Sequence, residues 1–270
     1  MNERKKKKKM FFFGALVALL LLAAAFAPAL TPYDPYEQDL SSALLPPSPS
    51  HLLGTDRYGR DMLSRVIMGS QTTVYAALLL VAAITVAGSM VGICCGYLGG
   101  RLDTVLMRIS DIFLAFPGMV FAIAVASVMS GGIMNAVIAL ACISWPKYAR
   151  IARSQVLSIR NMPYMAAARL SGLGTGRIIL RHIVPNIAGP VVVTAVLDIG
   201  TMIMEIAGLS FLGLGATPPT AEWGSMMSSG RSMLQTSPWV VLSPGCAIFL
   251  TVVIFNLAGD AVRDVLDPKK

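Results

Sequence analysis

Charged residues are scarce in this sequence. Lys, Arg, Asp and Glu together make up 13% of its 270 residues, whereas a soluble domain carries about a quarter charged residues. Hydrophobic residues make up 55% of the chain, and its mean hydropathy is +0.69. The shortage of charge therefore excludes an ordinary soluble domain and predicts an integral membrane protein held in a lipid bilayer.

The common catalytic and metal-binding motifs are also missing. The chain contains no G-x-x-x-x-G-K-[ST] loop for ATP phosphates, no H-E-x-x-H zinc motif and no G-x-S-x-G nucleophile motif. Its four cysteines form no C-x-x-C pair, so neither a disulfide framework nor a zinc site is indicated. We therefore expect no catalytic residues, no cofactor and no defined metal site, which argues against a membrane hydrolase.

Long apolar runs are present in number. A run of about 20 apolar residues is enough to cross a bilayer as a helix, and six such runs predict an all-α membrane domain with six transmembrane helices. The first run is preceded by Arg4 and Lys5–Lys9 and contains Ala25-Phe26-Ala27, so it also resembles a signal peptide. Its near-full spanning length and Pro28 favour an uncleaved helix. The predicted spans are 11–30, 72–97, 112–130, 134–152, 187–213 and 239–258.

The positive charges indicate the orientation of these spans. Eighteen of the 22 Lys and Arg residues lie in segments 1–10, 98–109, 147–185 and 259–270. Because cytoplasmic loops carry the excess of Lys and Arg, this pattern predicts that both termini are cytoplasmic and that segment 31–69 is outside. The net charge of +8 is thus explained by topology, and no nucleic-acid partner is expected. His51 and His182 fall on opposite sides, so they cannot share a metal ion.

Small and acidic residues mark two of the spans. Glycines recur every four residues at Gly88, Gly92, Gly96 and Gly100, a spacing that lets another helix of this chain or of a second subunit pack closely. In the fifth span, Asp198 and Glu205 are seven residues apart and share a helical face. An acidic side chain at this depth costs about 2.5–3.5 kcal/mol on insertion scales, so it faces a cavity or a partner. Two roles remain open, a cation path and hydrogen bonding to a neighbouring helix; the candidate pathway residues are Asp198, Met202 and Glu205.

A basic insert separates the fourth and fifth spans. Pro163 is suited to open a short helix, the glycine at Gly172 is suited to a turn with positive φ, and a second short helix is expected to end at Pro185. The pattern of two alanines, three residues, Gly172 and then Pro185 thirteen residues later resembles the cytoplasmic loop of ABC importer permeases that contacts the ATPase. The glutamate of that pattern is Ala166 here, so an ion pair from this position is not expected.

A second motif lies in the predicted outer segment. Residues His51–Arg65 carry alternating acids and bases with two glycines, which by itself is typical of a solvated, salt-bridged surface loop. The string H-x-x-G-T-D-x-x-G-R-D nevertheless resembles the signature of the peptide and nickel branch of ABC importer permeases. The segments 197–200 (LDIG) and 219–224 (PTAEWG) are more similar to the nickel permeases than to the dipeptide ones. The residues that match this outer motif are Gly54, Thr55, Asp56, Gly59, Arg60 and Asp61.

The resemblance has specific implications for fold and partners. It implies a type I ABC importer permease fold in the bacterial plasma (inner) membrane, a second homologous permease, two ABC ATPase subunits and an extracytoplasmic substrate-binding protein. This chain would form half of the pathway for nickel or a nickel chelate, with a di- or oligopeptide or an opine-type metallophore as the alternative. An ion-coupled secondary transporter that uses Asp198 and Glu205 is the hypothesis from another class, although the internal repeats typical of such folds are not found.

The resemblance also divides the chain into functional segments. The predicted segments are a cytoplasmic N-terminus (1–10), a first helix (11–30), an extracytoplasmic loop (31–69), the permease domain (70–260) and a cytoplasmic tail (261–270). Within the permease domain, segment 153–185 is the expected coupling loop. The resemblance implies that Tyr164, Ala167, Ala168, Gly172 and Pro185 take part in ATPase coupling.

Overall fold

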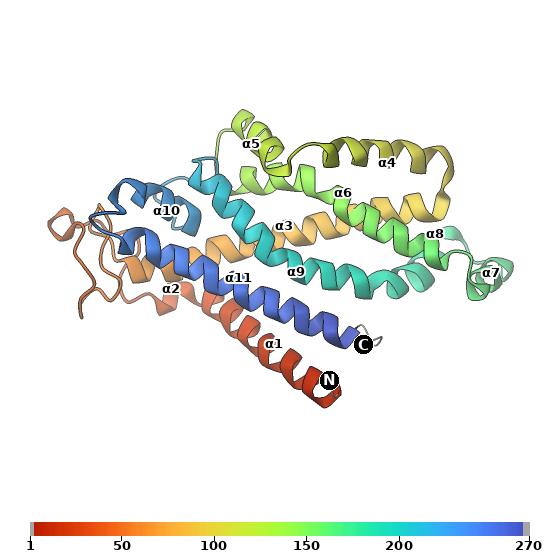
Figure 1. Cartoon of the computed structure of the whole chain (residues 1–270), viewed down its shortest axis with the longest axis horizontal. Helices are drawn as coiled ribbons and strands as arrows, with labels where there is room; N and C mark the ends of the chain where they lie inside the picture. Colours follow the sequence, from red (N-terminus) through yellow and green to blue (C-terminus); the bar gives the residue numbers. More distant parts are fainter. Residues whose placement is uncertain (1–2, 267–270) are drawn as a thin grey trace.

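The computed structural model describes residues 3–266, so the ends of the predicted cytoplasmic segments 1–10 and 261–270 lie outside the described residues. Within this range the chain is helical (Figure 1), apart from one isolated β-bridge between Thr55 and Asp61. The α-helices are α1 (Glu3–Ala25), α2 (Ala27–Leu30), α3 (Met62–Leu98), α4 (Gly100–Ala115), α5 (Gly118–Val128), α6 (Ile133–Ile159), α7 (Pro163–Leu170), α8 (Thr175–Ile178), α9 (Val184–Phe211), α10 (Trp223–Gly230) and α11 (Trp239–Leu266). A π-helix covers Ile179–Ile183, and 3₁₀-helices cover Leu40–Ser42 and Arg231–Met233.

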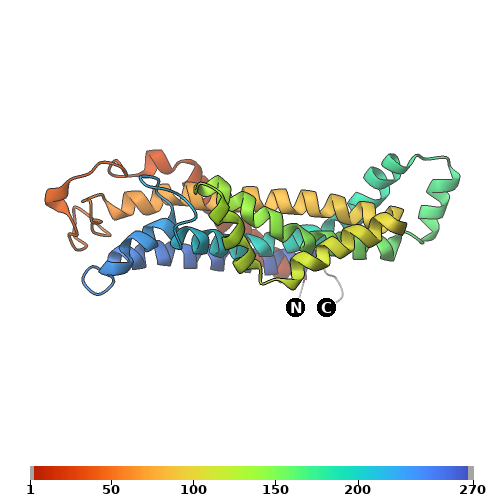
Figure 2. The same cartoon turned by 90° about the horizontal axis from the view of Figure 1, so that it is seen from above.

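The long helices α1, α3, α6, α9 and α11 run along one axis and form an elongated bundle (Figure 1). The loop between α2 and α3 lies at one end of the bundle together with α10, while α7 and α8 project from the opposite end (Figure 2). The main hydrophobic core lies between α3, α6, α9 and α11, and a second cluster packs the inner ends of α3 and α6 against α7 and α8. The two polar segments singled out in the sequence are therefore separated by the full length of the bundle.

Four of the described helices are long and apolar enough to cross a membrane, and a bent pair, α4 with α5, brings the number to five. The predicted span over 112–130 is not one continuous helix, because its residues are divided between α4 and α5 and the chain bends by 94° between these two helices. Proline disfavours the helical conformation of the residue before it. Phe116 accordingly has an extended backbone (φ −92°, ψ 147°), and α5 starts again after Pro117.

Helix α6 confirms the predicted helix over 134–152 and extends beyond it toward the basic insert, since it runs from Ile133 to Ile159. It is long enough to cross a membrane but less apolar than the four long helices above, because Lys147, Arg150 and Arg153 lie in its C-terminal half. Its apolar side is instead buried by α3. The count of six spans stays a prediction.

The glycine spacing in α3 serves contact with α6. A Cβ atom at Gly88, Gly92 or Gly96 would lie within 3 Å of α6 atoms, and at Gly92 it would be 2.2 Å from the carbonyl oxygen of Ala149. The stripe therefore faces another helix of this chain, which is one of the two predicted alternatives. Gly100 does not belong to it, because α3 ends at Leu98 and Gly100 begins α4 with φ of +65°.

Candidate coupling and transport sites

The basic insert forms two short helices that protrude beyond the bundle (Figure 2). Pro163 stands in the first turn of α7, where its missing N–H leaves no hydrogen bond unmade. Gly172 follows the helix with φ of +74°, which confirms the expected turn with positive φ. No atom lies within 4 Å of the place where a Cβ would stand at Gly172, so the requirement for glycine comes from the backbone conformation alone.

The expectation that a second short helix ends at Pro185 is wrong. The chain is helical without interruption from Thr175 to Phe211, through α8, the π-helix and α9. Pro185 lies in the first turn of α9. Proline supplies no N–H, and the wider π turn just before it absorbs the irregularity, since the amide of Val184 bonds five residues back to Ile179. The insert is thus joined directly to α9.

The predicted coupling residues do not share one surface. Ala168 is buried and packs in the second hydrophobic cluster with Met165 and Ile178. Tyr164, Ala167, Gly172 and Pro185 are exposed. Ala168 therefore holds the insert together, whereas the other four are available for contact.

Two exposed leucines of the insert were missed in the sequence. Leu170, at the end of α7, is 88% exposed, and Leu180, in the π-helix, is 72% exposed. Each lies near buried apolar residues of the second cluster, Met165 and Ala168 in α7 and Ile178 and Ile183 around the π-helix, so plotting the apolar positions on the helical period could have separated the buried face from the exposed leucines. Arg177 and Arg181 line a surface cavity beside Leu180. The tip of the insert thus carries both exposed apolar side chains and positive charge.

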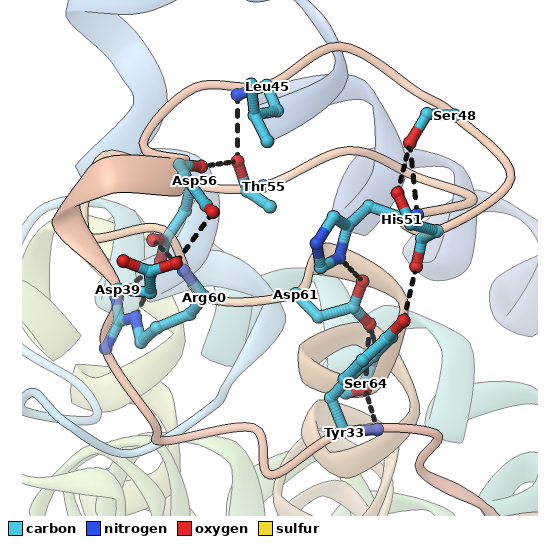
Figure 3. Close-up of polar contacts among 12 residues, drawn as sticks. Tyr33, Asp39, Leu45, Ser48, His51, Thr55, Asp56, Arg60, Asp61 and Ser64 are labelled. Carbon is cyan, nitrogen blue, oxygen red and sulfur yellow. Dashed lines mark hydrogen bonds and ion pairs between the residues drawn. The ribbon is translucent and has the colours of Figure 1, made fainter.

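The outer motif forms a closed hydrogen-bond network (Figure 3). Asp56 accepts hydrogen bonds from the Arg60 side chain at 2.7 Å (Nε), and the second guanidinium nitrogen of Arg60 lies 2.6 Å away. Asp56 also accepts from the Tyr58 and Arg60 amides at 2.8 and 3.1 Å, and Arg65 lies 3.7 Å away. Asp56 and Arg60 are each only 5% exposed. The interpretation as a solvated surface loop is therefore wrong, because this ion pair is buried and Asp56 has several hydrogen-bond donors around it.

The second acid of the motif fixes the start of α3. Asp61 is the N-cap of this helix and accepts hydrogen bonds from the Ser64 amide and hydroxyl, both at 2.7 Å. Its other oxygen lies 3.0 Å from His51 Nδ1. The Ser64 hydroxyl in turn accepts a hydrogen bond from the Tyr33 amide at 3.1 Å. Both ends of the outer segment are thereby tied to one helix terminus (Figure 3).

The small residues of the motif are required by close backbone contacts. Gly54 and Gly59 both have φ of +72°. A Cβ at Gly59 would stand 1.7 Å from the carbonyl oxygen of Asp39, and at Gly54 it would stand 2.6 Å from that of Leu45. Thr55 is fully buried, and its hydroxyl accepts from the Leu45 amide at 2.8 Å.

The outer network continues into α10 and α11. The Trp239 indole donates to the Thr55 carbonyl at 3.1 Å, and Arg65 donates to the Pro35 carbonyl at 2.8 Å.

Glu222, fully buried, caps α10 by accepting from the Gly224 and Ser225 amides at 2.8 Å each. Burial raises the pKa of Glu222, and these hydrogen bonds oppose the shift. Sequence reasoning missed Glu222, because glutamate is not among the preferred N-cap residues.

In α9 the two acidic residues have different surroundings. Asp198 is buried, and it accepts hydrogen bonds from Lys147 Nζ at 2.5 Å and from the Tyr148 hydroxyl at 2.9 Å. Both partners come from α6. The charge of Asp198 is thus balanced within the chain, which is the structural alternative of the two considered for the pair.

Glu205 lies instead at a groove of about 290 Å³ between α5, α9 and α11. It is half-buried, and the described part of the chain offers it no hydrogen bond or ion pair. Met202 does not line this groove, because it points into the main core and is 5% exposed; the neighbouring Met204 lines it. The complete lining is Met119, Thr201, Met204, Glu205, Val252 and Asn256.

Comparison with known proteins identifies the family. The family model described as a binding-protein-dependent transport system inner membrane component matches residues 88–270, and that of the N-terminal transmembrane domain of oligopeptide transport permease C matches residues 3–47. The chain is 45% identical to the probable D,D-dipeptide transport system permease protein of Escherichia coli (strain K12), with 90% of this chain and 82% of that protein covered. It is 41% identical to the nickel transport system permease protein of the same organism, with 88% and 86% covered.

The fold has a counterpart among solved structures. An inward-facing form of the MetNI methionine ABC transporter matches with a TM-score of 0.60 and 19% identity, covering 76% of this chain and 97% of that chain. At this identity the likeness concerns the fold, which is that of type I ABC importer permeases. The chain is therefore a member of the family of binding-protein-dependent transport system inner membrane components, in the peptide and nickel branch of the multi-pass ABC importer permeases, which are not enzymes because ATP hydrolysis belongs to a separate subunit.

Proposed function

We propose that this chain forms half of the translocation pathway of an ATP-driven importer, with a second homologous permease, two ABC ATPase subunits and an extracytoplasmic substrate-binding protein. The observation that carries the proposal is the insert at 161–183, which projects beyond the bundle and presents two exposed leucines, Leu170 and, beside two arginines, Leu180. Large apolar side chains exposed on a projecting segment offer a surface on which another protein can dock. The uninterrupted helix from Thr175 to Phe211 joins this surface to the core of the membrane domain.

The proposed topology has six membrane crossings with both termini in the cytoplasm. It rests on the clustering of Lys and Arg in four segments, on α6 as a crossing shielded by its neighbours, and on α4 with α5 as a bent crossing. It places the loop 31–69 outside the membrane. A cysteine introduced at Ser48 should react with an impermeant thiol reagent in intact cells that lack an outer barrier. Reaction only after lysis would overturn this topology.

In the proposed coupling step, the insert transmits movement of the ATPases to α9. Movement of the ATPases would be transmitted to α7 and α8, and then along the continuous helix to Asp198 and its partners on α6. In proteoliposomes that contain the complete transporter, Gly172→Trp should reduce both ATP-driven uptake and substrate-stimulated ATP hydrolysis, while complex abundance stays unchanged. Normal uptake and normal ATP hydrolysis by this variant would contradict the docking role.

The proposed cargo is a small peptide. The relatives with dipeptide and nickel in their names match at similar identity, so the groove on α9 is the more informative feature. Its polar groups are the oxygens of Glu205 and Thr201 and the amide of Asn256, and oxygen donors do not favour nickel over other divalent ions. Nickel or a nickel chelate is the second candidate, supported by the segments 197–200 and 219–224. Uptake of labelled alanyl-alanine and of ⁶³Ni²⁺ by the same proteoliposomes distinguishes the two.

A further inference from the structure

The groove between α5, α9 and α11 is lined by polar side chains that have no partner among the described residues. Glu205 carries the one carboxylate of this groove, and Thr201 and Asn256 are the other polar residues that line it. None of these three side chains makes a hydrogen bond or an ion pair within residues 3–266. A carboxylate at this depth of a membrane helix requires a cationic or hydrogen-bonding partner, because leaving it unpaired is costly. Because residues 3–266 supply no such partner, we look for it in a group that enters the groove.

The surrounding structure holds these groups in one place. Asn256 of α11 lies against the backbone of α9 at Gly200, where a Cβ would stand 3.0 Å from Asn256 Oδ1. On the other side, the Met119 methyl group of α5 reaches over Gly208, at 2.6 Å from the position of a Cβ there. Two glycines of α9 thus let α11 and α5 approach closely, and the groove with Glu205 lies between them. The break at Pro117 is what directs α5 onto this part of α9.

The chemistry of the three groups matches one class of ligand. A carboxylate, an amide oxygen and a hydroxyl oxygen together offer three hydrogen-bond acceptors. A primary ammonium group offers three donors and one positive charge, so it can satisfy all three while neutralising Glu205. Imidazole nitrogen suits nickel, whereas a set of oxygen ligands alone suits Mg²⁺, Ca²⁺ and Mn²⁺. The groove is therefore better suited to an ammonium group than to a free nickel ion.

We propose that Glu205, Asn256 and Thr201 form a transient binding site in the translocation pathway for the protonated amino group of the cargo. This inference rests on the proposed function, and it assigns to these residues the recognition of a primary ammonium. Asp198 does not contribute, because Lys147 and Tyr148 already occupy its oxygens at 2.5 and 2.9 Å. The site acts after the binding protein has released the cargo, so it sets the transport rate and leaves the apparent affinity unchanged.

Uptake kinetics provide the first test. With alanyl-alanine as the probe and the complete transporter in proteoliposomes, Glu205→Gln should lower the maximal uptake rate about tenfold or more, since hydrogen bonds to charged groups contribute about 1.5–3 kcal/mol. KM should stay unchanged, and Glu205→Asp should restore part of the rate. Thr201→Val should lower the rate less. The matched control is Thr194→Val on the same helix, whose hydroxyl is already bonded to the Pro190 carbonyl at 2.9 Å; its uptake should equal that of the wild type.

Thiol labelling provides a second test that needs no transport. The probes are two methanethiosulfonate reagents, one that carries a cationic trimethylammonium group and one that carries an anionic sulfonate group. They are applied to a Met204→Cys variant of the complete transporter in which the four native cysteines are replaced. The Glu205 carboxylate should make the introduced cysteine react faster with the cationic reagent than with the anionic one. Glu205→Gln should remove most of this difference in rate. Equal preference with and without Glu205, or unchanged uptake in Glu205→Gln at equal complex abundance, would overturn the inference.

The outcomes separate this inference from the proposed function. If the wild-type complex shows no ATP-driven uptake of either alanyl-alanine or nickel, the proposed function fails, while the labelling preference can still be measured. If uptake is normal and the labelling preference is absent, the inference alone fails. If Glu205→Gln lowers the abundance of the assembled complex, Glu205 pairs with a cation of the second permease, and the assignment to cargo is wrong.

Discussion

The two polar segments at opposite ends of the bundle differ in how their side chains are satisfied. In the outer segment, Asp56, Arg60 and Asp61 are buried and bonded to several partners, and Gly59 has no room for a side chain. In the insert, Gly172 has open space around it, and Leu170 and Leu180 face outward. The polar side chains of the outer segment are satisfied within the described residues, whereas the insert exposes the apolar side chains that we propose contact an ATPase. Variants of the first should damage the fold, and variants of the second should damage coupling.

The largest effect is expected for Gly59→Ala. A Cβ 1.7 Å from a backbone oxygen cannot be accommodated without moving the loop, so we expect destabilisation by more than about 3 kcal/mol. Gly213→Ala is the matched control, because it also has positive φ (+86°) but nothing within 4 Å, and it should cost only about 1–2 kcal/mol. The thermal midpoint of the purified protein in detergent measures both. Equal midpoints would mean that the outer loop is not rigid.

The next effect concerns the buried ion pair. Asp56→Ala leaves Arg60 buried without its partner, and breaking such a pair costs about 3–5 kcal/mol. The double variant Asp56→Ala/Arg60→Leu should recover part of this loss, because no unpaired charge from the pair is left. As a control, Lys9→Ala breaks an exposed pair with Asp264 at 3.5 Å and should cost less than about 1 kcal/mol. A double variant as unstable as Asp56→Ala alone would argue against charge burial as the cause.

A smaller effect, of a different kind, is expected at the insert. Leu180→Asp should leave the thermal midpoint unchanged, because the side chain is already 72% exposed, but it should weaken ATPase association about tenfold, as loss of an interface anchor does. Leu40→Asp is matched to it, since Leu40 is also 72% exposed but lies in the outer segment. Copurification of the ATPase with each variant measures the effect. Equal recovery with both variants would remove Leu180 from the interface.

The smallest effect is expected for a substitution that strains the backbone at Gly172 without causing a steric clash. Gly172→Ala should cost about 1–2 kcal/mol in the turn and reduce substrate-stimulated ATP hydrolysis severalfold, while complex abundance stays normal. Gly176→Ala is the control, because Gly176 also has open space around it but lacks the positive φ. ATP hydrolysis in proteoliposomes, with and without binding protein, compares the two variants. If both behave like the wild type, the turn at Gly172 is not required for coupling.

Local features of the fold followed from the sequence wherever one residue type decides the backbone. The positive φ at Gly172 and the helix start at Pro163 were predicted on this basis, and the helix over 134–152 was predicted from its apolar run. The 94° bend within the apolar run over 112–130 did not follow from hydropathy, because hydropathy records the length of a segment and not its direction, which changes at Pro117. Pro185 was misread as a helix end because a π turn can precede a proline at the start of a helix.

Pairs between residues far apart in the chain could not be predicted from the sequence. Asp198 and Glu205 look equivalent along α9, and only the packing of α6 gives Asp198 its partners Lys147 and Tyr148. The burial of Asp56 and Arg60 likewise depends on the surrounding outer loop and on α11 packing beside it, because alternating charges in sequence are equally typical of an exposed loop. Spacing therefore indicates which residues share a face, but not what covers that face.

The central claim is that the insert is the surface that contacts the ATPase. The most direct measurement is photo-crosslinking of the complete transporter with a benzophenone side chain placed at position 180 and, separately, at position 40. The account predicts a crosslink to an ATPase subunit from position 180 and none from position 40. Crosslinking of the ATPase from position 40, or its absence from position 180 in a complex that hydrolyses ATP, would contradict the account.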